Sequence, residues 1–245
     1  MEFDLLKLSL LFLIIIFSQT VETTTGFGAT VIALSLGVNL FPLKELVVVL
    51  VMIGCLQSAW IVARGFKNIR WRILLGRIIL GAGLGMPVGI FVFRHFQGSQ
   101  LKPILGIFVI IIASYELFLL IRSVQIKPLP LPLGLFILFL GGVVHGTFAT
   151  GGPLVVYYSS REIQKKEEFR PTISMLWLIL NLTLLGSYII GKNLKSQSLI
   201  FAGILFPALV LGIIFGEIIH KKISERAFKF AVQIILLFTG IFILI

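Results

Sequence analysis

The chain has 245 residues, of which 58% are hydrophobic and only 13% are charged. A typical soluble domain is about 45–50% apolar and about 25% charged, so a mean hydropathy of +1.10 excludes an ordinary soluble protein. The net charge is +11, and in so apolar a chain this indicates basic loops beside a membrane rather than a nucleic-acid partner. The single cysteine excludes a disulfide-stabilised scaffold. The composition predicts an all-α polytopic membrane protein whose surroundings are the lipid bilayer.

The first apolar run, Leu5–Phe17, is interpreted as a membrane helix rather than a signal peptide. Glu2 and Asp4 outweigh Lys7 near the start of the chain, and no small-residue cleavage site follows the run. Several further runs are about 20 residues long, which matches a hydrocarbon core of about 30 Å. In chain order, the further helices are predicted at Ala29–Leu40, Glu45–Ala63, Trp71–Phe93, Leu101–Ile121, Leu131–Thr147, Pro153–Ser160, Pro171–Ile190, Ser198–Ile219 and Arg226–Ile245.

Two of these segments, Ala29–Leu40 and Pro153–Ser160, are short and follow Gly- and Thr-rich polar stretches. We expect each to be a half-helix that forms a hairpin with the helix before it. With both hairpins returning to their starting face, one face of the protein carries most of the Lys and Arg residues. The positive-inside rule then places this face in the cytoplasm and both termini outside. The basic loops concerned are at 64–72, 122–127, 161–170 and 221–229.

A proline-rich connector at 128–132 divides the chain into a first repeat, 1–127, and a second repeat, 128–245. Each half contains five predicted segments, an odd number, so the second half enters the membrane from the opposite face. Inverted repeats with interrupted helices are typical of secondary transporters. The residues that match between the halves at nearly constant offset are Gly28 with Gly152, Gln57 with Asn181, Gly76 with Gly203, Gly85 with Gly212, Gly89 with Gly216, Arg94 with Lys221, and Lys102 with Lys229.

The two polar breaks, Glu22–Ala29 and His145–Pro153, are the most informative features. Non-helical backbone at membrane depth persists only where protein or water satisfies its polar groups. Glycine permits the unusual torsions, and Pro153 suits the first turn of a new helix. Each half-helix would direct free N–H groups and its positive dipole end at the membrane centre, where two such ends would bind a small anion. The alternative is tight packing of Gly and Thr at helix contacts.

The predicted site combines these breaks with Gln57 and Asn181, two mid-span amides at matching positions of the repeats, each of which could bind a ligand or simply hydrogen-bond another helix. Glu22 and His145 are candidate carriers of a coupled proton, because carboxylates and imidazoles titrate when desolvated. The alternative, given equal weight, is that both brace the unwound backbone by hydrogen bonds. The candidate substrate-binding residues are Thr23, Thr24, Thr25, Gly26, Phe27, Gly28, Gln57, Thr147, Thr150, Gly151, Gly152, Pro153 and Asn181.

At these residues the sequence resembles the sulfite exporter TauE/SafE family of membrane transporters. Thr150–Pro153, followed by Phe169-Arg170, looks like the second copy of the family's glycine-rich motif, and Gly26–Ala29 is similar to the first copy but poorer in glycine. The resemblance covers nearly the whole chain. It implies movement of small sulfur-containing anions or organic acids, such as sulfite and sulfonates, across a prokaryotic inner membrane.

The sequence thus predicts a secondary active transporter that moves a small, sulfur-containing oxyanion by alternating access, with a proton or another ion as candidate coupling partner. A passive anion channel lined by the same breaks is the alternative. An enzyme is not expected, because the sequence has no Walker motif, zinc motif or nucleophile elbow. No cofactor and no metal site are predicted.

Overall fold

The computed structural model describes residues 5–122, 129–163 and 165–220, together with residues 234, 237, 241 and 244. Within these residues the chain is helical and has no strand, which confirms the all-α class for them. The predicted helix Arg226–Ile245 lies outside the described residues except for those four positions. The elements are α1 (Leu5–Thr25), α2 (Ala29–Gly37), α3 (Leu43–Gly65), η1 (Phe66–Asn68), α4 (Trp71–Ile73), η2 (Leu74–Ile78), α5 (Ile79–His95), α6 (Gly98–Arg122), α7 (Leu131–Phe148), α8 (Gly152–Glu162), α9 (Lys166–Ile190) and α10 (Ser196–His220).

Seven helical segments of the described chain are long and apolar enough to cross a membrane. They comprise α1, α3 with η1, the segment from α4 to α5, α6, α7, most of α9 and α10. Large apolar side chains are exposed along them, among them Leu84, Ile111 and Phe136, and such surface is stable in lipid rather than in water. The chain is therefore a multi-pass membrane protein.

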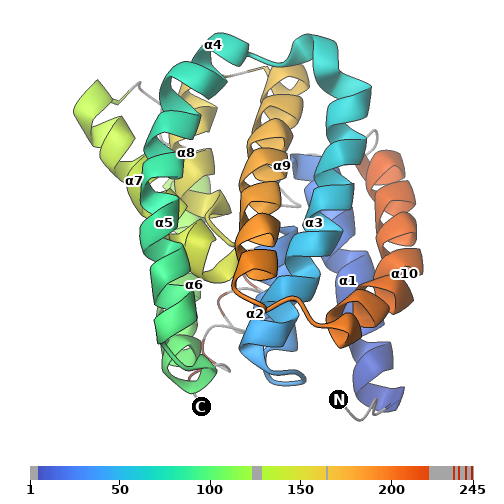
Figure 1. The fold of residues 1–245 in the computed structure, drawn as a ribbon. Helices are drawn as coiled ribbons and strands as arrows, with labels where there is room; N and C mark the ends of the chain where they lie inside the picture. The colour runs from blue at the N-terminus through green and yellow to red at the C-terminus, as the bar shows by residue number, and fades with distance from the viewer. Residues whose placement is uncertain are drawn as a thin grey trace.

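Two helical hairpins, α1–α2 and α7–α8, open toward opposite ends of the bundle (Figure 1). The end of α2 lies beside the start of α1, since a Cβ on Gly37 would come within 3.3 Å of Leu11. The end of α8 lies beside the start of α7, where Gly134 faces the ring of Tyr158. Each hairpin contains one full span and one half-helix, as the sequence predicts.

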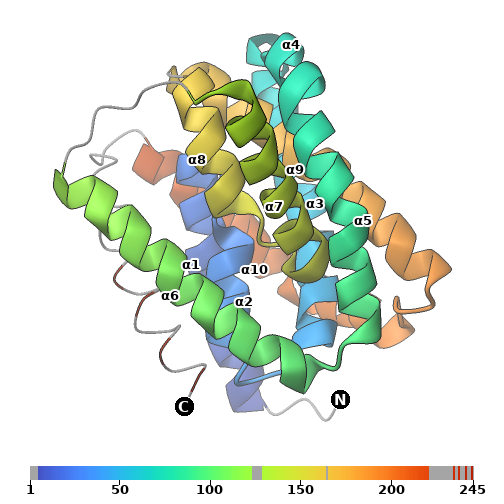
Figure 2. The same cartoon turned by 90° about the vertical axis from the view of Figure 1, so that its left-hand side faces the viewer.

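Each hairpin packs against a long helix from the other half of the chain. α1 packs along α10 and α7 packs along α5, while α3 and α9 pack against each other (Figure 1). Glycine brings the α5 and α7 backbones into contact. A Cβ on Gly85 would overlap the carbonyl of Phe139, and one on Gly142 would overlap the carbonyl of Ala82. α6 crosses the bundle obliquely and touches α2 and α3 (Figure 2).

The ends of α3, α8 and α10 meet the starts of α4 and α9 at one end of the bundle, which we call the basic face (Figure 1). Four ion pairs among the described residues connect elements there, and two of them join the segment from Arg70 to Ile78 to α8 and α9. Arg77 in η2 pairs with Glu162 in α8 at 2.7 Å, and Arg70 pairs with Glu168 in α9 at 3.6 Å. Described Lys and Arg residues at this end of the bundle include Arg64, Lys67, Arg70, Arg72, Arg77, Arg161, Lys165 and Arg170.

Candidate functional site

Both predicted interruptions are present, and each is shorter than expected. The predicted breaks spanned Glu22–Ala29 and His145–Pro153, whereas only Gly26–Gly28 and Ala149–Gly151 are non-helical. The polar residues that precede each break form the last turn of a long helix. The half-helices α2 and α8 begin directly after the breaks.

The threonine hydroxyls beside the breaks bond to their own helices. Thr24, Thr25 and Thr147 each donate to the carbonyl of the residue four positions earlier, at 2.8, 2.9 and 2.9 Å. A threonine is tolerated near a helix end when its hydroxyl bonds to the carbonyl four residues earlier, at a slight cost to the helix. These three side chains therefore belong to helix ends rather than to unwound chain.

The chain reverses through left-handed backbone in both breaks. Gly26 has φ 91° and Gly28 has φ 103°, values that favour glycine, and Ala149 has φ 57°. The two long helices also end in the same way. The Gly26 N–H donates to the Glu22 carbonyl and the Ala149 N–H to the His145 carbonyl, both at 2.7 Å.

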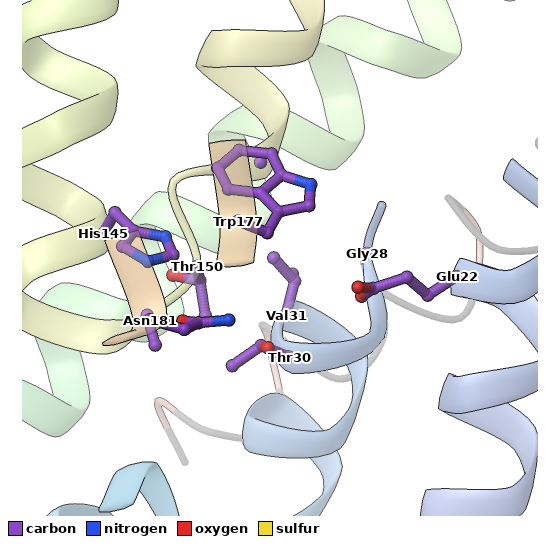
Figure 3. Close-up of a pocket in the computed structure, with 10 residues that line it drawn as sticks. Glu22, Gly28, Thr30, Val31, His145, Thr150, Trp177 and Asn181 are labelled. Atoms are coloured by element: carbon purple, nitrogen blue, oxygen red, sulfur yellow. The ribbon is translucent and has the colours of Figure 1, made fainter. Parts of the chain in front are cut away.

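A small pocket lies between the two breaks (Figure 3). Its free volume is about 20 Å³, which is room for about one water molecule. Residues of the first half in its wall are Glu22, Gly28, Thr30 and Val31. Residues of the second half in its wall are His145, Ala149, Thr150, Gly152, Trp177 and Asn181.

The Glu22 carboxylate caps the half-helix α2. It is buried, and its Oε2 accepts the N–H of Ala29, the first residue of α2, at 2.9 Å. A carboxylate is favourable at a helix N-terminus because it accepts an otherwise unpaired N–H and meets the positive end of the dipole. No ion pair of Glu22 with a described cation is present. An incoming anion would therefore meet an acidic side chain at this helix end.

Trp177 joins the two breaks. Its indole Nε1–H donates to the Gly26 carbonyl at 3.2 Å, and its ring stacks on His145 with centroids 5.4 Å apart and planes 15° apart. One side chain of α9 thus touches the end of α1 and the end of α7. In Figure 3 the Trp177 ring lies between His145 of the second half and Gly28 of the first half.

Three polar atoms at the pocket are buried without a hydrogen-bond partner in the described chain. They are both ring nitrogens of His145, which is 2% exposed, and the hydroxyl of Thr150, which is 1% exposed. Leaving a buried polar group unpaired costs about 1–3 kcal/mol. These atoms converge on the pocket together with the amide of Asn181 (Figure 3). The arrangement can donate hydrogen bonds to a small polar solute.

The structure thus brings six of the predicted site residues to one pocket: Glu22, Gly28, His145, Thr150, Gly152 and Asn181. Gly26, Phe27, Gly151 and Pro153 supply the backbone and packing of the breaks. Gln57 does not line the pocket, because its amide donates to the Thr23 hydroxyl and to the Gln19 carbonyl. Thr23 is the partner of Gln57, so neither residue reaches the site that Asn181 lines.

Four pocket residues were not among the predicted set: Thr30, Val31, Ala149 and Trp177. Trp177 lies four residues before Asn181, so the two share a face of α9. The four-residue spacing is the sequence signal that could have placed Trp177 beside the predicted site residue Asn181.

Comparison with known proteins gives a consistent result over most of the chain. A family model described as sulfite exporter TauE/SafE matches residues 11–243. A probable sulfite/organosulfonate exporter TauE of Cupriavidus necator is 24% identical over 209 residues, which cover 80% of this chain and 77% of that protein. A probable inner membrane transporter protein TsaS of Comamonas testosteroni is 22% identical over 185 residues, covering 72% of this chain and 73% of that protein. No solved structure matches the chain.

Proposed function

The chain belongs to the sulfite exporter TauE/SafE family of membrane transporters, and on that premise we propose that it is a secondary active transporter for a small sulfur-containing oxyanion. Sulfite and sulfonates are the candidate substrates. The name of one relative, a probable sulfite/organosulfonate exporter, supports this substrate class, and the name of the other, a probable inner membrane transporter, supports transport across the inner membrane.

One observation carries the proposal. Unpaired buried donors, from His145 and Thr150, converge with two half-helix starts on one pocket. The first turn of a helix leaves N–H groups without partners inside the helix and carries its positive dipole end. Together these groups would bind the oxygens of a small anion without a lysine or arginine in the pocket.

The packing of the helices supports an inverted repeat of 1–127 and 128–245. In such a repeat α1 matches α7, α3 matches α9, and α5 matches α10. The contact of α1 with α10 then matches the contact of α7 with α5, and the central contact of α3 with α9 joins two matching helices. The hairpins α1–α2 and α7–α8 open in opposite directions (Figure 1). A pseudo-twofold axis in the membrane plane would relate these pairs, as in other transporters with half-helices at the substrate site.

The size of the pocket favours alternating access over a passive channel. A space of about 20 Å³ accepts one water molecule, whereas an open pore would need a wider and continuous path. We infer that the described conformation is an occluded one and that the site widens when it faces either side. Movement of one repeat against the other would provide this change.

Glu22 is the candidate for coupling to a proton. Its carboxylate already occupies the N-terminus of α2, so an anion at the same helix end would lie beside a second negative charge. Like charges at one site are unfavourable. Anion binding would thus favour a proton on Glu22, and the two would move together. His145 is the second candidate, since its ring nitrogens face the same pocket.

The basic face supports a cytoplasmic orientation for that end of the bundle. The N-terminus of α1 lies at the opposite end (Figure 1). We propose that the protein is a multi-pass protein of the inner membrane with both termini outside.

The test is flux of labelled methanesulfonate and sulfite in proteoliposomes. We expect saturable uptake with counterflow, and an increase of about tenfold in the half-saturating concentration for Thr150→Val, because a hydrogen bond to a charged ligand is worth about 1.5–3 kcal/mol. Thr183→Val is the matched control, since Thr183 is exposed and bonds to its own helix. Flux equal to protein-free liposomes would refute the substrate class, and single-channel currents would favour the channel.

A further inference from the structure

A second cavity opens at the basic face, between the end of α3, the start of α9 and the end of α10. Its volume is about 460 Å³, far larger than the pocket between the breaks. We call this cavity the vestibule. Its walls carry the guanidinium groups of Arg64 and Arg170 and the carboxylates of Glu167 and Glu217. A hydrated oxyanion fits a space of this size.

Two arginines converge on one carboxylate in the vestibule. Arg170 Nη2 lies 2.7 Å from Glu217 Oε1, and Arg64 Nη1 lies 4.0 Å from the other oxygen of Glu217. Arg170 is the more buried arginine, with 15% of its side chain exposed, and its Nε has no hydrogen-bond partner in the described chain. Guanidinium groups bind carboxylates and other oxyanions through the same forked geometry, so an oxyanion could replace the Glu217 carboxylate on Arg170.

The Arg170–Glu217 pair lies directly over the first break. A Cβ on Gly26 would come within 3.2 Å of the Arg170 Cα, so α9 and the break are in close contact at this point. On the α10 side, the Thr24 hydroxyl lies 3.3 Å from the carbonyl of Gly216, the residue before Glu217. The ion pair therefore joins α9 to α10 across the end of α1.

One face of α9 connects the vestibule with the pocket between the breaks. Arg170, Ser174, Trp177 and Asn181 are spaced so that they lie on one side of the helix. Arg170 lines the vestibule, and Trp177 and Asn181 line the pocket. Ser174 lies between them, and its buried hydroxyl has no hydrogen-bond partner in the described chain. This row places an arginine at the vestibule, a buried serine hydroxyl between the two cavities and an amide at the pocket between the breaks.

We propose that the vestibule is an entry site for the transported oxyanion, and that the Arg170–Glu217 ion pair is the gate that the anion opens by taking the place of the Glu217 carboxylate. The inference rests on the proposed function, because it assumes that an anion reaches the pocket between the breaks. It adds a second binding position and assigns Arg170 to substrate recognition. Glu217 acts as the resident counter-ion of Arg170, and release of Glu217 frees α10 from α9 at the basic face.

The test compares Arg170→Gln with Glu217→Gln, using methanesulfonate uptake in inverted and in right-side-out membrane vesicles. Arg170→Gln removes the guanidinium that would bind the anion, so it should raise the half-saturating concentration about tenfold or more. Glu217→Gln removes the competing carboxylate, so it should lower that concentration about threefold or more. Both changes should appear for the vesicle orientation in which the basic face meets the added substrate. A purely structural ion pair would instead give shifts of the same direction in both variants, and that result overturns the gate.

Arg70→Gln is the matched control, because Arg70 pairs with Glu168 at the same face and does not line the vestibule. Thermal unfolding of each purified variant shows that it is folded. Wild-type protein that moves neither methanesulfonate nor sulfite would refute the proposed function and with it the gate. Saturable wild-type transport with unchanged half-saturation in both variants would refute the gate alone.

An anionic lipid headgroup has the same chemistry as the proposed solute, so the measurement is repeated in phosphatidylcholine proteoliposomes with and without phosphatidylglycerol. We expect the half-saturating concentration to be the same in both. A rise with phosphatidylglycerol that is absent in Arg170→Gln would assign the vestibule to lipid and overturn the proposal.

Discussion

Replacing Glu22 with Gln should separate the proposed proton coupling from movement of the substrate. In the wild-type protein the Ala29 N–H donates to the Glu22 carboxylate at 2.9 Å, and a glutamine oxygen can accept the same hydrogen bond. Glutamine, however, neither carries a charge nor exchanges a proton at neutral pH. A one-to-one proton symporter would accumulate a monoanion about tenfold for a gradient of one pH unit, since one unit corresponds to about 1.4 kcal/mol. In Glu22→Gln we expect an accumulation ratio near one, with counterflow retained.

The same substitution has a modest expected effect on stability. A hydrogen bond to a charged group is worth about 1.5–3 kcal/mol and a neutral one about 0.5–1.5, so the Ala29 contact weakens by about 1 kcal/mol, but glutamine also avoids the cost of burying a charge, and the two effects oppose each other. Loss of the favourable interaction with the helix dipole adds a cost of similar size to that of the weaker contact. We expect the unfolding temperature to change by no more than a few degrees, which leaves a folded protein for transport assays.

The assay uses proteoliposomes loaded with buffer at one pH unit above or below the outside, with the membrane potential held at zero by valinomycin and equal potassium. Methanesulfonate is the probe because it remains a monoanion. Glu45→Gln is the control, since Glu45 also lies in the first turn of a helix, α3, but not at the pocket. Tenfold accumulation in Glu22→Gln would refute the coupling role of this carboxylate.

Three further predictions concern packing and the division of roles between polar residues. Gly142→Ala should lower the unfolding temperature by several degrees, because the new Cβ would overlap the backbone of Ala82, whereas Gly186→Ala, which has open space, should be neutral or slightly stabilising. Trp177→Phe should cost about 1–3 kcal/mol in chemical denaturation because the Gly26 carbonyl loses its donor, and the exposed Trp60→Phe should cost much less. Gln57→Leu should lower stability and leave the half-saturating substrate concentration unchanged, while Asn181→Leu should raise that concentration; equal effects on transport would contradict the separation of the two amides.

The membrane class and the two interruptions could be predicted from the sequence because both depend on local composition. Long uncharged runs require lipid, and glycine clusters beside polar residues interrupt them. The extent of each break could not be predicted in the same way. Thr24, Thr25 and Thr147 look like loop residues in an apolar chain, yet each bonds to its own helix.

The content of the site was predictable only in part, because it depends on how each helix is rotated about its axis. Gln57 and Asn181 hold matching positions in the sequence, but Gln57 faces α1 and Asn181 faces the pocket. Trp177 resembles the aromatic residues that face lipid or the core, and only its contacts with Gly26 and His145 identify it as a bridge. The vestibule joins residues that are far apart in the chain, so no local pattern signals it.

Long helices of each half pack against helices of the other half, which has a consequence for a protein cut into two fragments. A cut within the connector at 128–132 would part α1 from α10 and α7 from α5, so each fragment would keep a long helix without the surface that covers its small residues. Neither fragment produced alone should escape proteolysis, while co-expression should restore a complex that can be purified intact. The boundary between the two repeats in the sequence is therefore not a boundary between two parts that are stable on their own.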